Sequence, residues 1–144
     1  MDLRFIPQTI GPEAEIINVK VAPQLFNLLE LASIELGNDS PEYHSAILSF
    51  FLDKLSKQQF SPFVVNRQLN HGILKGKAMK TITFSGWELS QRISLIRAKS
   101  CLNATGDIIK LVILNIYEEV LKERKVKQIQ KVRKQIAQFH TLYI

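Results

Sequence analysis

Histidine and cysteine are the side chains of this 144-residue chain that most often bind metals or attack substrates, and the chain has three histidines and one cysteine. His44, His71 and His140 lie far apart and form no metal-ligand spacing with Cys101. Cys101 precedes apolar Leu102 at the expected end of a helix, so we expect a packed thiol rather than a nucleophile. The sequence also has no phosphate-binding glycine loop and no nucleophile elbow. We therefore expect no enzymatic activity, no metal and no cofactor.

The distribution of charge indicates a different kind of chemistry. Residues 1–56 hold three basic and eight acidic side chains, whereas residues 57–144 hold sixteen basic and five acidic ones. The second half therefore has a net charge of +11, which favours a polyanionic partner, and nucleic acid is the first candidate. Attraction between the two oppositely charged halves of the chain is the alternative explanation.

The same composition argues against secretion and membrane insertion. A single cysteine excludes an intramolecular disulfide framework, and the first residues have no apolar signal-peptide core. The most apolar stretch, 108–117, is broken by Lys110 and Asn115 and is too short to span a bilayer. We expect a cytoplasmic protein that does not enter a membrane.

Two segments of about forty residues share one order of signals: a short strand, a helix, a tight turn and a second helix. Strand 16–21 alternates apolar and polar residues, with Asn18 and Lys20 on its polar face, and strand 79–84 does the same with Thr81 and Thr83. Neither strand is long enough to be stable alone. We therefore expect them to pair as one antiparallel ribbon.

The helices are expected from their caps and their apolar spacing. Ser85 and Glu88 have the spacing of a capping box before a first helix that includes Trp87, and Gly37 favours the end of the matching helix in the first segment. Ser40 with Pro41 predicts the start of the second helix there. The second helices of the two segments are the most apolar, and we expect them to pack together through Ile47, Phe50, Ile113 and Ile116.

The end of the chain predicts one more helix, which is basic and amphipathic. Apolar residues recur at helical spacing from Val126 to Tyr143, and residues 122–144 hold seven basic side chains against one acid. Its apolar stripe could fold back on the same chain, pair with the same helix of a second chain or lie on a membrane. Packing against protein is favoured, with a homodimer through this helix ahead of folding back.

Strand, helix, turn and helix in about forty residues resembles the ribbon-helix-helix family of DNA-binding proteins. The second segment is the closer match: 81–85 looks like the strand and first cap of small plasmid copy-number repressors, and 102–105 looks like the turn before their second helix. The family works as a dimer whose paired strands enter the DNA major groove. The resemblance therefore implies a mainly α protein with a short two-stranded ribbon, in which two tandem copies form a single-chain pseudo-dimer.

This resemblance divides the chain into four parts. Residues 1–57 are the first repeat with an N-terminal arm, 58–78 a connector with about one helical turn, 79–121 the second repeat and 122–144 the basic helix.

Site residues follow from the same resemblance. Outward strand residues read bases, and these are Asn18, Lys20, Thr81 and Thr83. The N-terminus of the second helix anchors DNA phosphates, and in the second repeat this site is Asn103, Ala104, Thr105 and Gly106. The first repeat departs from the pattern, because Pro41 lacks an N–H donor and Asp39 and Glu42 would repel a phosphate. Further phosphate contacts are expected from the basic helix, through Lys125, Lys127, Lys131, Arg133 and Lys134.

The sequence thus predicts a sequence-specific protein that binds double-stranded DNA, and within that class a transcriptional repressor. The alternative is a protein-interaction or assembly module that uses the same fold without specific readout of DNA.

Overall fold

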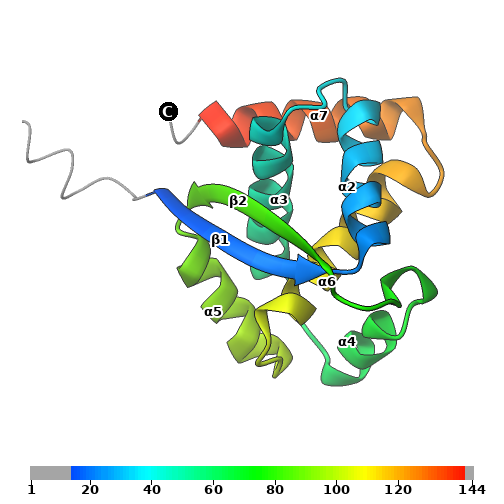
Figure 1. Ribbon diagram of the computed structural model, residues 1–144. Coiled ribbons are helices and arrows are strands. Elements are labelled where there is room, and N and C mark those ends of the chain that lie inside the picture. Colours follow the sequence, from blue (N-terminus) through cyan, green and yellow to red (C-terminus); the bar gives the residue numbers. More distant parts are fainter. Residues whose placement is uncertain (1–13, 142–144) are drawn as a thin grey trace, which may run out of the picture.

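An antiparallel ribbon of two strands lies across the front of the computed structural model, which describes residues 14–141 (Figure 1). The order strand, helix, helix occurs twice, and a short helical connector separates the two units. The mainly α class with one short ribbon is therefore confirmed. The elements are β1 (Ala14–Val21), α2 (Pro23–Glu35), α3 (Pro41–Ser56), α4 (Pro62–Leu69), the 3₁₀ turn η1 (Gly72–Leu74), β2 (Lys80–Trp87), α5 (Leu89–Ser100), α6 (Thr105–Ile116), the π-helical turn η2 (Tyr117–Leu121) and α7 (Val126–Thr141).

The pairing of the strands agrees with the prediction, although the strands are longer than expected. β1 runs antiparallel to β2, with Asn18 opposite Thr83 and Lys20 opposite Thr81. The ladder continues to Trp87, for which the sequence predicts a helix. The connector also differs from the prediction, because α4 and η1 together contain more helix than the single turn expected there.

The capping box predicted at Ser85 is wrong. Ser85 lies in β2 opposite Ile16, and α3 also holds its backbone, since its N–H donates to Ser45 Oγ (3.2 Å) and its carbonyl accepts from Ser49 Oγ (3.0 Å). The chain turns into α5 at Glu88, which has a left-handed φ of 56° and provides no side-chain cap.

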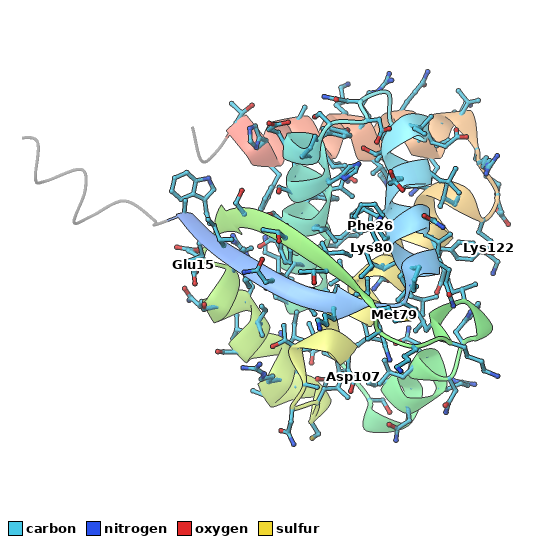
Figure 2. All side chains as sticks on the ribbon, in the orientation of Figure 1. Glu15, Phe26, Met79, Lys80, Asp107 and Lys122 are labelled. Carbon is cyan, nitrogen blue, oxygen red and sulfur yellow. The ribbon has the colours of Figure 1, made fainter. Side chains whose placement is uncertain are left out.

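An acceptor from the other strand takes over the capping of α5. The carboxylate of Glu15 accepts a hydrogen bond from the backbone N–H of Ser90 (3.2 Å), in the first turn of the helix. A carboxylate at this end of a helix is favourable, because it meets free N–H groups and the positive end of the helix dipole. Figure 2 shows Glu15 on β1, next to the start of α5.

The signals at the end of α2 and the start of α3 are confirmed. Gly37 adopts a φ of 91°, and the N–H groups of Gly37 and Asn38 donate to the carbonyls of Ile34 and Ser33, which is the Schellman pattern. Ser40 then accepts a hydrogen bond from the backbone N–H of Tyr43 (3.2 Å) and so caps α3.

The centre of the core lies where α3 and α6 pack together behind the ribbon. Ile47, Ile113 and Ile116 are at most 1% exposed, as predicted. The prediction that Phe50 is buried in this contact is wrong, because its side chain is only partly buried. Its ring lies at the edge of this core, where it packs edge-on against Phe139 of α7, with ring centroids 5.8 Å apart.

A buried ion pair links the two strand-helix-helix units. The guanidinium of Arg92 on α5 is 7% exposed, and its Nε donates to Asp53 Oδ1 of α3 at 3.0 Å. It also donates to the carbonyl of Trp87. Breaking such a pair leaves an uncompensated buried charge, which costs far more than losing a surface pair.

The basic helix α7 folds back on its own chain. Its residues Val132 and Ile136 are at most 1% exposed, and the helix packs against α3 and η2. Arg133 Nε donates to the carbonyl of Leu36 (2.9 Å), at the end of α2. The apolar stripe is therefore covered within the chain from Ile129 to Phe139, and Tyr143 lies outside the described residues. The apolar face of the helix therefore does not need a second chain to cover it, which was the reason to expect a homodimer through this face.

Truncation of Ile113 to Ala should lower the free energy of unfolding by about 2–5 kcal/mol, because it leaves a cavity between α3 and α6. Ile34, which is 57% exposed on α2, provides the matched control, and Ile34→Ala should cost less than about 0.5 kcal/mol. Urea unfolding followed by circular dichroism measures both. A loss below about 1 kcal/mol for Ile113→Ala would show that this contact is not the centre of the core.

Candidate nucleic-acid interface

The ribbon has one buried face and one exposed face. Side chains alternate along both strands, and Val19, Val21, Ile82 and Phe84 are turned towards the helices and buried. The opposite face is solvent-exposed along its length (Figures 1 and 2). We call it the outer ribbon face, and it consists of Ile16, Asn18, Lys20, Thr81, Thr83 and Ser85.

All four residues predicted to read bases lie on the outer ribbon face, in two adjacent cross-strand pairs. Asn18 faces Thr83, and Lys20 faces Thr81. The hydroxyl of Thr83 donates to Asn18 Oδ1 at 2.5 Å, so one lone pair of the amide oxygen is used. The side-chain NH₂ group of Asn18 takes no part in this bond and can donate to a ligand.

A third pair, not predicted from the sequence, lies on the same face. Ile16 is 71% exposed and lies opposite Ser85, two positions along each strand from Asn18 and Thr83. Ile16 escapes notice because it is apolar, and Ser85 because its local pattern is that of a helix cap. The two-residue period of the strands is the signal that could have found them.

The two ends of the ribbon are fixed by contacts of the strands with helices. At one end Lys80 Nζ lies 4.0 Å from the centroid of the Phe26 ring of α2, and at the other Glu15 contacts α5 (Figure 2). These contacts leave the outer ribbon face itself uncovered among the described residues.

The predicted phosphate site at the start of α6 lies beside β1. Ala104 is the N-cap and provides no side-chain cap, while Arg97 of α5 donates to the carbonyl of Asn103 (3.1 Å) and to Thr105 Oγ1 (2.6 Å). A Cβ added at Gly106 would have Val19 Cγ2 as its nearest neighbour, at 4.0 Å. The first turn of α6 thus combines backbone N–H donors with a guanidinium next to the ribbon.

Asp107 reduces the positive potential there, but Lys110 lies close to it. The distance from Lys110 Nζ to Asp107 Oδ1 is 3.7 Å. Figure 2 shows Asp107 at the start of α6, below the ribbon.

The start of α3 lies beside β2 and has a different chemistry. Pro41, Asp39 and His44 line a hollow together with Thr83 of the ribbon. His44 Nε2 lies 3.0 Å from Asp39 Oδ1. Glu42 is exposed in the first turn of α3. The two helix starts thus flank the ribbon, with carboxylates at the start of α3 and a carboxylate together with a guanidinium at the start of α6.

The basic residues of α7 lie on its exposed side and away from the outer ribbon face. Lys127, Lys131, Arg133 and Lys134 line a shallow hollow on that side. Only the other end of the helix approaches the ribbon, where Phe139 lines a hollow with Ala14 and Trp87. The structure therefore does not bring the predicted basic tail together with the base-reading residues.

Two of these predicted phosphate contacts are already engaged within the chain. Arg133 binds the end of α2 through the Leu36 carbonyl, and Lys125 Nζ lies 2.8 Å from Glu123 Oε2. That hydrogen bond and charge contact raise the pKa of Lys125 and lower the pKa of Glu123.

The residues first considered for catalysis remain separate. In residues 14–141 no three side chains of the metal-ligating types gather into a group. His71 Nδ1 accepts from the backbone N–H of Ile73 (3.2 Å), far along the chain from His44 with its Asp39 partner. The expectation of a packed Cys101 thiol is wrong, because Cys101 is exposed. It is the residue at the end of α5 and has a left-handed φ of 61°.

Comparison of the chain with protein-family models, with curated proteins and with solved structures finds no match. None of the helices within residues 14–141 is long and apolar enough to cross a membrane.

Replacing Gly106 with Ala should leave the free energy of unfolding unchanged or raise it by up to about 0.5 kcal/mol, because its φ is ordinary and the new methyl group meets only Val19. Gly37→Ala is the contrasting variant. There a φ of 91° is strained for Ala, and the methyl group would meet the Arg133 guanidinium, so we expect a loss of about 1 kcal/mol or more. Thermal unfolding compares the two, and a destabilised Gly106→Ala variant would contradict this geometry at the start of α6.

Proposed function

We propose that this chain is a sequence-specific DNA-binding protein that inserts the outer ribbon face into the major groove and represses transcription. The observation that supports it best is the exposed row of three cross-strand pairs on a ribbon whose other face is buried. The major groove is wide enough to admit a two-stranded ribbon. This mode of binding is the one implied by the resemblance to the ribbon-helix-helix family.

The side chains of the outer ribbon face suit base edges in the major groove. Lys20 can donate to O6 and N7 of guanine, and Asn18 can donate to N7 of adenine through its NH₂ group. The hydroxyls of Thr81 and Thr83 can bond either base, and their methyl groups, like the side chain of Ile16, can pack on the methyl group of thymine. Because helices cover the other face of the ribbon, these groups are held in place before DNA arrives, which reduces the entropic cost of binding.

We propose further that the two strand-helix-helix units form a single-chain pseudo-dimer. Along the helices and the turn between them, corresponding positions of the two units are separated by one constant interval in sequence. These pairs are buried Leu25 and Leu89, Leu29 and Ile93, Ala32 and Ile96, the left-handed Gly37 and Cys101, and the N-caps Ser40 and Ala104.

The connections after the two units support the same relation. α4, which follows α3, packs on α6, while α7, which follows α6 and η2, packs on α3. A twofold rotation about an axis that passes between the two strands would exchange these two contacts. One chain would then supply the whole reading surface that two chains supply in an ordinary dimer.

A homodimer through α7 stays a prediction. The buried stripe of Val132 and Ile136 is not available to it, so a second chain would have to contact the exposed basic side of the helix. Sedimentation of the chain at several concentrations tests this, and the proposal for DNA binding does not depend on the result.

The decisive experiment is a mobility-shift assay with genomic fragments, including DNA upstream of the chain's own gene. We expect one or a few fragments to be retained at moderate salt, where non-specific binding is weak. If the protein retains no DNA, or retains all fragments equally, specific binding is refuted. If no DNA is retained, a protein-interaction module becomes the better interpretation.

Lys20→Ala should weaken binding to the preferred site by about 1–3 kcal/mol and relax the preference at one base pair. Lys57→Ala is the matched control, because it removes the same charge from the exposed end of α3, far along that helix from the ribbon. We expect it to have little effect. Titrations with a panel of single-base variants distinguish the two, and equal weakening on every sequence would mark Lys20 as a backbone contact.

Replacing Lys127, Lys131 and Lys134 together with Gln should reduce the slope of log affinity against log salt by about 0.9 for each phosphate that is no longer neutralised. The substitution is preferable to deletion of 122–144, which would uncover the core residues that Val132 and Ile136 pack against. The preferred sequence should stay the same, since such contacts carry no sequence information. An unchanged slope would show that α7 only packs.

A further inference from the structure

We infer that the DNA site of this protein is non-palindromic and that the chain occupies it in a single orientation. The inference rests on the proposed function and specifies the class of duplex that the outer ribbon face would select. It comes from a chemical difference between the two strands and between the two flanks of the ribbon.

The two strands present different functional groups to the groove. On β1 the outer residues are an apolar side chain, an amide and a cation, in the order Ile16, Asn18, Lys20. On β2 all three are hydroxyls, in the order Thr81, Thr83, Ser85. Turning the protein by 180° would exchange Lys20 and Asn18 for hydroxyl groups, so the same base pairs would meet different partners.

The strand β1 should therefore determine most of the base preference. Lysine and asparagine match particular bases, whereas Ser and Thr hydroxyls bond either. From Ile16 to Lys20 the strand spans roughly 13 Å, which is about four base-pair steps. Lys20 is also the only charged residue of the outer ribbon face, so it favours the half of the site that offers guanine.

The two flanks differ as well. At the start of α6, beside β1, the first turn contains Asp107, but Arg97 is also present and donates to Thr105 Oγ1 and to the carbonyl of Asn103. At the start of α3, beside β2, Asp39 and Glu42 are acidic and Pro41 lacks a donor.

The two helices that follow the two units, α4 and α7, also differ in their number of basic residues. The helix that follows the second unit and packs on α3 is α7, which contains Lys127, Lys131, Arg133 and Lys134. The helix that follows the first unit and packs on α6 is α4, whose only basic residue is Arg67. Contacts to the DNA backbone would therefore also change if the protein were turned around.

Selection from a randomised DNA duplex library is the first test. We expect an enriched motif whose two halves are unrelated, with a preference at about four neighbouring base pairs. A palindromic motif would overturn this inference and leave the proposed function intact. If no sequence is enriched, the proposed function fails, and the inference fails with it.

The orientation can be tested with the native chain, because its single cysteine is exposed at the end of α5, just before α6. A DNA-cleaving iron chelate attached to Cys101 should cut the selected duplex on one side of the motif. Inverting the motif within the same fragment should move the cuts to the other side. Cuts of equal strength on both sides would mean that the protein binds in both orientations, and would overturn the inference.

A relocated cysteine provides the matched control. In the variant Cys101→Ser with Asn38→Cys, the chelate is attached at the end of α2, just before α3, which is the corresponding turn of the first unit. Asn38 is exposed, so the substitution should be tolerated. We expect cuts on the opposite side of the same motif. Cuts on the same side as those from Cys101 would contradict the placement of the two helix starts on opposite flanks.

Discussion

The pairing of β1 with β2 is the contact on which the rest of the molecule depends. Each strand is too short to persist alone, and an isolated two-stranded ribbon is marginal in water. Its stability comes from the inner face, where Val19, Val21, Ile82 and Phe84 are buried against helices from both units. The pairing also closes a loop of more than fifty residues, so its entropic cost must be recovered by that burial. The outer ribbon face exists only because the inner one is covered.

Polar contacts between the two units specify how they meet. Arg92 of the second unit forms a buried pair with Asp53 of the first, and Glu15 of the first unit caps α5 of the second. Both contacts join an acidic group of the first half to the second half. Attraction between the halves therefore accounts for part of the uneven charge distribution, although most of the excess positive charge lies on exposed side chains of α7 and the connector. A buried pair is weak evidence for stability but excludes alternative packings that would leave its charges unpaired.

Local signals in the sequence were sufficient where the pattern lies within one short segment. The alternation of residues in 16–21 and 79–84 determined both strands and the face on which Asn18, Lys20, Thr81 and Thr83 lie. The same holds for the end of α2 at Gly37 and for the start of α3 at Ser40, since these caps involve only residues a few positions apart. Such signals depend only on the types and spacing of residues that are close in sequence.

The tertiary structure decided the features that depend on distant partners. Ser85 had the local pattern of a cap, but it lies in β2 opposite Ile16, side chains of α3 bind its backbone, and Glu15 caps the helix instead. Whether α7 would cover its own chain or a second one could not follow from an amphipathic stripe, which records that a face is buried but not against what. In the same way, the apolar pattern of α3 did not show that Phe50 lies at the edge of the core, where it is only partly buried. The sequence by itself thus determined the two strands, the helices of both units and α7, while the contacts between distant residues decided which exposed groups gather on one surface.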